Sequence, residues 1–133
     1  MDEMEQQVWQ RIHAGPGAQG RLELRPLMAL SAENMGVYRG MLDGKHREKV
    51  RRLLEWEQAN FRAMRGMCRL CGSDPGSWTP GRGKNPGRRG LEGCYRRAKQ
   101  LLAEYMARSA EPEFGTVFRC LAQRQEEILA RGV

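Results

Sequence analysis

Polar residues interrupt apolar stripes of helical spacing, and they are the residues of this chain best placed for chemistry. Glu57 and Asn60 stand where the apolar stripe of residues 50–71 should continue. A carboxylate in a core-facing stripe is costly unless it is paired, protonated or bound to a ligand. In an antiparallel arrangement of helices, such residues could meet at one level of the core. The cluster consists of Ser31, Asn34, Glu57, Asn60 and Gln125.

This polar cluster has more than one interpretation. We favour a hydrogen-bonded network that fixes the register of the helices, because buried polar groups can be kept for packing uniqueness alone. The alternative is a pocket for a small ligand or a single cation. If the other polar side chains do not pair with Glu57, we expect its carboxyl to be protonated, since desolvation raises a carboxyl pKa.

Cys68 and Cys71 form a second candidate site, with the Cys-x-x-Cys spacing of redox and zinc sites. Arg65 and Arg69 are near enough in sequence to lower a thiol pKa and make the thiol oxidisable. However, a structural zinc usually needs a second pair, and no strand–helix–strand pattern surrounds the motif. We therefore favour two helix-end thiols without a role. The other cysteines lie on apolar stripes and are expected in the core: Cys94 and Cys120.

A basic stretch follows between residues 82 and 99, where seven Lys/Arg stand against one acid, Glu92. It carries nearly all of the formal net charge of +7 and could attract nucleic acid or an acidic partner. No aromatic interleaving or nucleic-acid motif accompanies it, so we favour a solvated loop and helix face. The stretch contains Arg82, Lys84, Arg88, Arg89, Arg96, Arg97 and Lys99.

The elements that position these residues are helices. A chain of 133 residues with frequent Met and few β-branched residues predicts a single all-α domain. The periodicity predicts a short N-terminal helix, which with its linker occupies residues 1–20, and a four-helix bundle over residues 21–133. The four helices of the bundle are expected at residues 26–42, 46–72, 91–109 and 113–130.

Residues 72–90 contain six glycines and three prolines, and this composition predicts a long loop. Nineteen extended residues reach about 60 Å, whereas the stretch 50–71 would form a helix about 33 Å long. The loop can therefore return along the whole bundle and make the second and third helices parallel.

Residues 27–129 resemble the rubrerythrin-like branch of the ferritin-like superfamily. The resemblance rests on Tyr95 and on the run LLAEYMARSAEPEFGTVFRCLAQRQEEIL, where a proline follows a short loop and a Phe-x-x-Leu-Ala segment leads into a charged tail. It implies a bundle with one long crossover connection. It also implies two metal ions, held by a Glu from each of two helices and a Glu-x-x-His pair from each of the others.

On this alignment Glu57 is the only residue that matches a metal ligand of the family. One carboxylate with two amides and a hydroxyl does not offset the charge of two metal ions. His13 and His46 lie outside the apolar stripes and are expected on the surface. The resemblance therefore implies a bundle that has lost its di-metal centre. The ligand positions fall at Ser31, Glu57, Asn60, Ala98, Gln125 and Ile128.

These observations favour a non-enzymatic interaction or scaffold module without a cofactor, which binds a second copy of itself or another protein. Trp9, Trp56 and Trp78 are the expected apolar anchors. Two alternatives remain: a residual metal or thiol-redox protein that uses Glu57, Cys68 or Cys71, and a nucleic-acid-binding module that uses residues 82–99. A phosphate-binding loop and a catalytic triad both lack their required context.

No apolar run approaches the length of a membrane span, so no membrane association is expected. The N-terminal residues are acidic and amphipathic and lack an apolar signal core. We therefore expect a cytoplasmic protein.

Overall fold

The computed structural model describes residues 22–76, 78 and 87–131, with the side chains of 87–89 excepted. This part of the chain forms four α-helices and no strand: α3 (Arg25–Gly40), α4 (Arg47–Leu70), α5 (Gly87–Ala107) and α6 (Gly115–Arg131). The prediction of an all-α protein is confirmed. The expected N-terminal helix and linker, residues 1–20, lie outside the described residues.

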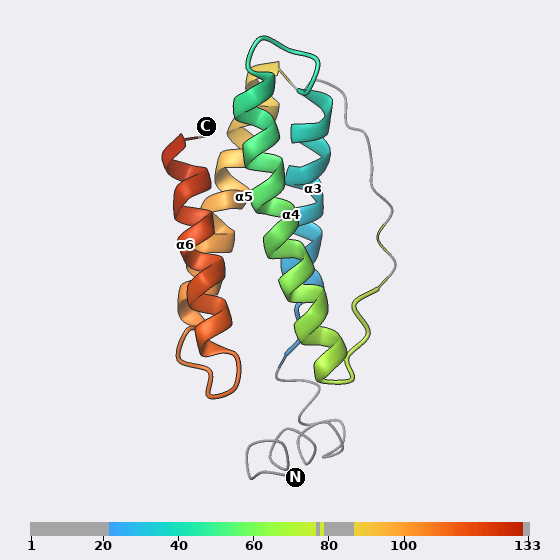
Figure 1. Ribbon diagram of the computed structural model, residues 1–133, viewed down its shortest axis with the longest axis vertical. Coiled ribbons are helices and arrows are strands. Elements are labelled where there is room, and N and C mark those ends of the chain that lie inside the picture. Colours follow the sequence, from blue (N-terminus) through green and yellow to red (C-terminus); the bar gives the residue numbers. More distant parts are fainter. Residues whose placement is uncertain (1–21, 77, 79–86, 132–133) are drawn as a thin grey trace.

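The four helices pack as a bundle in which α4 and α5 occupy one diagonal (Figure 1). Helix α3 packs against α4 and α5, and α6 packs against the same two helices. Helices α3 and α6 run in one direction along the bundle, and α4 and α5 run in the other. Every helix is thus antiparallel to both of its neighbours, and α4 ends at the opposite end of the bundle from where α5 begins.

Three of the expected helices begin and end within about two residues of those observed, but α5 does not. It begins at Gly87, so the last four residues of the expected loop 72–90 are helical. The loop prediction is wrong there because it relied on glycine content. A glycine inside a helix costs only about 1 kcal/mol relative to alanine, and packing of the following turns against α3 outweighs that cost.

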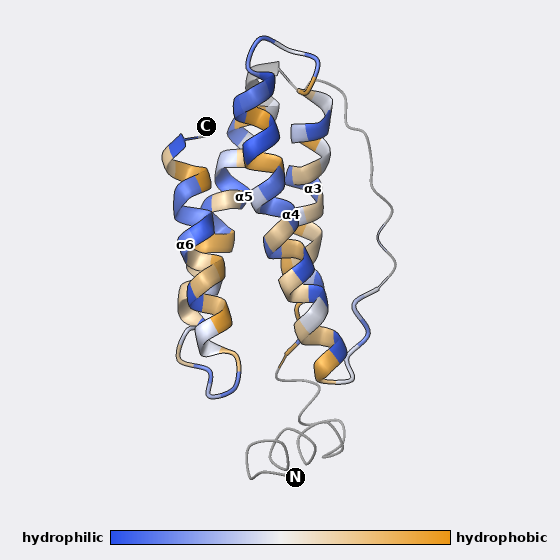
Figure 2. Ribbon diagram, viewed as in Figure 1, coloured by the Kyte–Doolittle hydropathy of each residue, from blue (hydrophilic) through white to orange (hydrophobic). Residues whose placement is uncertain are grey.

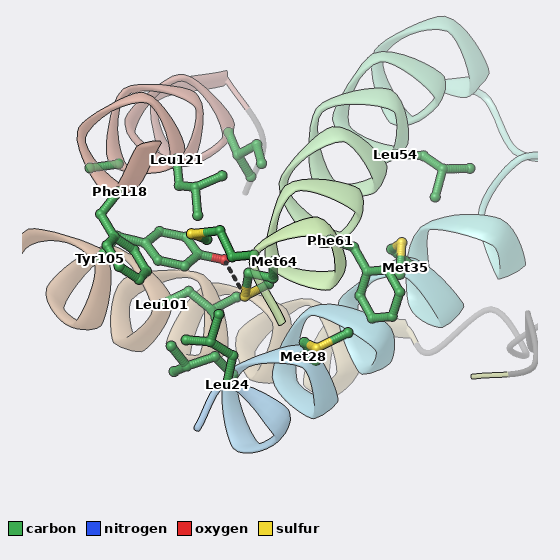
Figure 3. Packing of buried hydrophobic residues seen from close by; sticks show 14 of the residues in the cluster. Leu24, Met28, Met35, Leu54, Phe61, Met64, Leu101, Tyr105, Phe118 and Leu121 are labelled. Atoms are coloured by element: carbon green, nitrogen blue, oxygen red, sulfur yellow. Dashed lines mark hydrogen bonds between the residues drawn. The ribbon is translucent and has the colours of Figure 1, made fainter. Parts of the chain in front are cut away.

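The core lies along the axis of the bundle and is built from large side chains of all four helices (Figure 3). Tyr105 of α5 and Phe118 of α6 are among its largest fully buried residues. The Tyr105 hydroxyl donates to the sulfur of Met64 at 3.7 Å, as the dashed line in Figure 3 shows. This contact joins α5 to α4 across the diagonal of the bundle.

Cys120 of α6 is expected in the core but lies outside it, as does Tyr95 of α5. Tyr95 is 39% exposed and Cys120 is exposed. Each neighbours a buried residue, Cys94 or Leu121, which takes the inward direction on its helix. Successive residues on a helix differ by about 100° in direction, so the neighbour of a residue that faces the core can point toward solvent.

Gly115, the first residue of α6, is expected to tolerate no side chain. A Cβ atom there would lie 2.5 Å from the backbone oxygen of Ser109, in the turn that joins α5 to α6. Since this neighbour is backbone, Gly115→Ala should lower the free energy of unfolding by about 1–3 kcal/mol. Gly36→Ala is the matched control: a Cβ there meets nothing within 4 Å, and the change should stabilise α3 by about 0.5–1 kcal/mol. Urea unfolding of both variants checks this, and equal effects would contradict it.

Candidate functional site

The structure brings the five polar residues together as a buried layer across α3, α4 and α6. All five side chains are 0% exposed. The Ser31 hydroxyl donates to Oε2 of Glu57 at 2.9 Å, which joins α3 to α4. The Asn60 amide donates to Oε1 of Gln125 at 3.3 Å, which joins α4 to α6. Each helix places its polar residues on the same face as its apolar stripe, which is why they become buried when the stripes pack.

Glu57 is the only charged residue type in this layer, and its surroundings disfavour the charge. Burial raises the pKa of its carboxyl to about 7, although Ser31, Gln125 and Asn34 act to lower it. Within the described residues no ion pair joins Glu57 to a cation. Its Oε1 and the Nε2 of Gln125 have no hydrogen-bond partner there. The carboxyl is therefore best accommodated in its neutral, protonated form.

Two tyrosines border the layer. Burial raises the pKa of both Tyr38 and Tyr105, and the charge of a nearby ionised Glu57 would raise them further. The hydroxyl of Tyr38 is buried and has no hydrogen-bond partner among the described residues. Neither phenol is suited to losing its proton, so Tyr38 acts as a packing group, and Tyr105 packs and donates a hydrogen bond to Met64.

Asn34 bridges α3 to one turn of α5. Its Nδ2 donates to the backbone oxygen of Cys94 at 3.2 Å. Its Oδ1 accepts from Nε of Arg97, three residues further along α5, at 2.6 Å. Arg97 is also 3.4 Å from a carboxylate oxygen of Glu33. The bridge holds α3 and α5 in one register.

Asn60 bridges α4 to α6 in the same way. Its Nδ2 donates to the backbone oxygen of Leu121 at 3.2 Å, and its Oδ1 accepts from Arg124, three residues further on, at 3.4 Å. The two asparagines therefore make matching bridges between the two pairs of neighbouring helices that are not joined by a short turn. A hydrogen-bonded layer of this kind favours one register of a helical bundle over its alternatives.

Sequence analysis missed the role of Arg97 and did not single out Arg124. Arg97 follows Cys94 by three residues, at the edge of an apolar stripe, and that spacing is a possible signal. Arg124 is exposed and precedes the buried Gln125. Nothing in its sequence context indicates that it donates a hydrogen bond to Asn60.

The basic stretch is not a single solvated face. Arg96 and Lys99 are exposed on α5, and the Lys99 ammonium lies 5.2 Å from the ring centre of Tyr95. Arg97 differs, because its side chain is only 23% exposed and is directed at Asn34. The expectation of a solvated Arg97 is therefore wrong. Arg82 and Lys84 lie outside the described residues, and only the backbone of Arg88 and Arg89, in the first turn of α5, is described.

The Cys-x-x-Cys pair lies where α4 ends. Cys68 is buried, and this burial raises the pKa of its thiol instead of lowering it. The expected effect of neighbouring arginines is therefore wrong; the Arg65 guanidinium lies 5.8 Å from the ring centre of Phe61. Cys71 is partly buried and caps the helix. A thiol whose pKa is raised is a weak nucleophile and a poor redox centre at neutral pH.

The four thiols are expected to differ in reactivity. Cys120 is exposed and should react with a thiol reagent in the native protein. Cys68 and Cys94 are buried, and burial raises the pKa of both, so they should react only when the protein unfolds. Counting labelled thiols by mass spectrometry, with and without denaturant, checks this. Rapid native labelling of Cys68 would revive the redox alternative.

The tryptophan anchors are partly used within the chain. The rings of Trp78 and Phe61 pack edge to face, with their centres 5.7 Å apart. The indole N–H of Trp78 donates to the backbone oxygen of Pro75. Trp56 is partly buried on α4, with the Arg131 guanidinium 5.5 Å from its ring centre. Trp9 lies outside the described residues.

A di-metal centre does not fit the residues present. Its expected ligand positions supply one carboxyl, which burial keeps neutral up to about pH 7. The amides of Asn60 and Gln125 are bonded to one another. Within the described residues no group of three or more His, Cys, Asp or Glu is close enough to hold a metal ion.

No protein-family model, curated protein or solved structure matches the chain. None of the helices in the described part of the chain is long and apolar enough to span a membrane.

Proposed function

We propose that the chain is a ferritin-like helical bundle that has lost its di-metal site and acts as a non-enzymatic interaction or scaffold module. One observation carries this proposal. Every position that the resemblance assigns to a metal ligand is 0% exposed, although the residues there are mostly not ligands. These positions are Ser31, Glu57, Asn60, Ala98, Gln125 and Ile128.

The connectivity of the helices also supports the resemblance. Two antiparallel hairpins, α3–α4 and α5–α6, are arranged so that α4 and α5 are parallel on a diagonal. This is the order of a bundle with one long crossover connection. On this proposal the hydrogen-bonded layer occupies the level at which such bundles hold their metals, and it favours the same packing without ions.

Exposed apolar side chains supply contacts for a protein partner, which we propose to be a second copy of the chain. Leu70 and Met106 are both 55% exposed, and each lies near the end of its helix. Helices α4 and α5 end at the same end of the bundle (Figure 1). Cys68, Cys94 and Cys120 are free thiols, as is usual in a cytosolic chain.

Metal analysis and sedimentation of the full chain, purified without chelator, test the proposal. We expect far less than one metal ion per chain and a mass above that of the monomer at micromolar concentration. Stoichiometric iron, manganese or zinc would overturn the loss of the metal site. A monomer at all concentrations would overturn self-association.

A further inference from the structure

The outer face of the first half of α4 is strongly basic. Residues 45–52 read KHREKVRR, with five Lys/Arg against one acid. All of these charged side chains are exposed. In Figure 2 the ribbon of the first turns of α4 has mostly the colour of hydrophilic residues. The residues that form it are Lys45, Arg47, Glu48, Lys49, Arg51 and Arg52.

Two adjoining surface hollows follow this face. The first, of about 470 Å³, lies at the turn before α4 and is lined by Lys45, Arg47 and Lys49, together with Asp43. The second, of about 480 Å³, continues along α4 and is lined by Lys49, Arg52 and Trp56. Glu48 and Lys49 line both hollows, and we call the two adjoining hollows together the α4 groove.

Most cations of the α4 groove have no ion-pair partner among the described residues. Glu48 is paired with Arg51 at 2.9 Å, which leaves Glu55 as the other acid of the second hollow. Lys49 and Arg52 form no ion pair with an acid in the described part of the chain. The N-terminus of α4 adds the positive end of a helix dipole at the start of the groove. An anionic chain laid along the groove would gain these contacts without breaking internal ones.

An aromatic ring stands at the far end of the row of cations. Lys49, Arg52 and Trp56 are spaced i, i+3 and i+7, so they share one face of α4 and span about 10 Å. Arg131, from the end of α6, also lines the groove and lies 5.5 Å from the Trp56 ring centre. The guanidinium lies over one face of the ring, so a base would stack on the outer side of the guanidinium or take its place on the ring.

We propose that the α4 groove binds single-stranded nucleic acid, with phosphates along Lys45, Lys49 and Arg52 and a base stacked at Trp56 and Arg131. Basic grooves with stacking aromatics are the common design of single-strand binding sites. An acidic protein would use the same cations but would not need the ring. This inference goes beyond the proposed function, because it depends on the surface of α4 and not on whether the buried polar layer once held metal ions.

Binding of a dye-labelled oligo-dT of about 16 nucleotides, followed by fluorescence anisotropy over a range of salt concentrations, tests the inference. Lys49→Gln/Arg52→Gln should weaken binding about tenfold. It should also make the slope of log K against log salt shallower by about 1.4, because each of the two lost phosphate contacts contributes about 0.7 on a single strand. Trp56→Leu should weaken binding by about 5- to 100-fold and leave the salt slope unchanged. Trp56→Phe keeps a stacking ring and should retain most of the affinity.

Arg96→Gln/Lys99→Gln is the matched control, because it removes the same charge from the exposed face of α5. It should change affinity by less than about twofold. Thermal melts establish that each variant is folded, and the Phe variant separates loss of the ring from loss of packing. Three results would overturn the inference: no binding by the wild type at low salt, an equal loss in the α5 control, or wild-type binding by Trp56→Leu. Stronger binding of a duplex than of the single strand would overturn it as well.

Discussion

Replacing Glu57 with glutamine is expected to stabilise the bundle by about 3 kcal/mol at pH 8 and to change its stability little at about pH 4. The side chain is fully buried, and its carboxyl has a pKa raised by desolvation from 4.5 to about 7. Glutamine has nearly the same shape as the protonated acid. It can accept the hydrogen bond from Ser31 but cannot ionise.

The direction of this pH dependence follows from the pH at which the folded and unfolded states each release the proton of Glu57. The unfolded chain loses it near pH 4.5, whereas the folded protein keeps it until about pH 7. Between these values the folded state binds more protons, so stability falls as the pH rises through this window and then levels off. Below pH 4.5 the group is neutral in both states and the penalty vanishes.

Urea unfolding of the wild type and of Glu57→Gln at closely spaced pH values measures this effect. The difference between the two free energies of unfolding should grow from about pH 4.5 to about pH 7 and stay constant above. Glu55→Gln, an exposed residue of the same helix, is the control and should follow the wild type. Parallel curves for wild type and Glu57→Gln would show that the pKa of Glu57 is the same in the folded and unfolded states, and would contradict the prediction.

Helical periodicity was sufficient to predict the helices and the polar layer. Val50, Leu53 and Met64 of α4 are buried, as their spacing requires, and Glu57 lies on the same face and is buried with them. Spacing alone also placed Gln125 inside the core. Helical spacing did not predict which residues of different helices contact one another. The bridges from Asn34 and Asn60 depend on which turns of α5 and α6 face them, and that is decided by packing.

The positions of exposed charged side chains were predicted less well than those of buried apolar ones. The sequence concentrates its excess of cations at residues 82–99, yet Arg97 is directed into the bundle and bonds Asn34. In residues 43–55 the Lys and Arg residues are interspersed with the acids Asp43, Glu48 and Glu55, so the net charge of this segment is modest. Folding separates them: Glu48 pairs with Arg51, while Lys49 and Arg52 stay on the face that carries Trp56. A basic face of a helix is a property of spacing and pairing, which composition does not capture.

Rebuilding the ligand set is expected to give a bundle that requires metal to fold. The variant carries five changes at fully buried positions, each restoring the residue type that the resemblance assigns there. Without metal, it buries additional carboxyl and imidazole groups, and its free energy of unfolding should fall by at least about 3 kcal/mol. The changes are Ser31→Glu, Asn60→His, Ala98→Glu, Gln125→Glu and Ile128→His.

Adding Zn²⁺ or Mn²⁺ to this variant should restore the helical signal and raise the melting temperature, because metal binding then contributes to folding. Mass spectrometry under native conditions should find about two ions per chain. The same variant with Glu57→Gln lacks the one carboxylate that the natural sequence has at these positions, and it should bind metal more weakly. If the five-residue variant neither binds metal nor recovers its fold, these positions do not converge on one site, and the ferritin-like origin of the buried polar layer is wrong. If it does recover, the six positions converge as the resemblance requires, since ligands from four helices can share two ions only when their side chains point to one place.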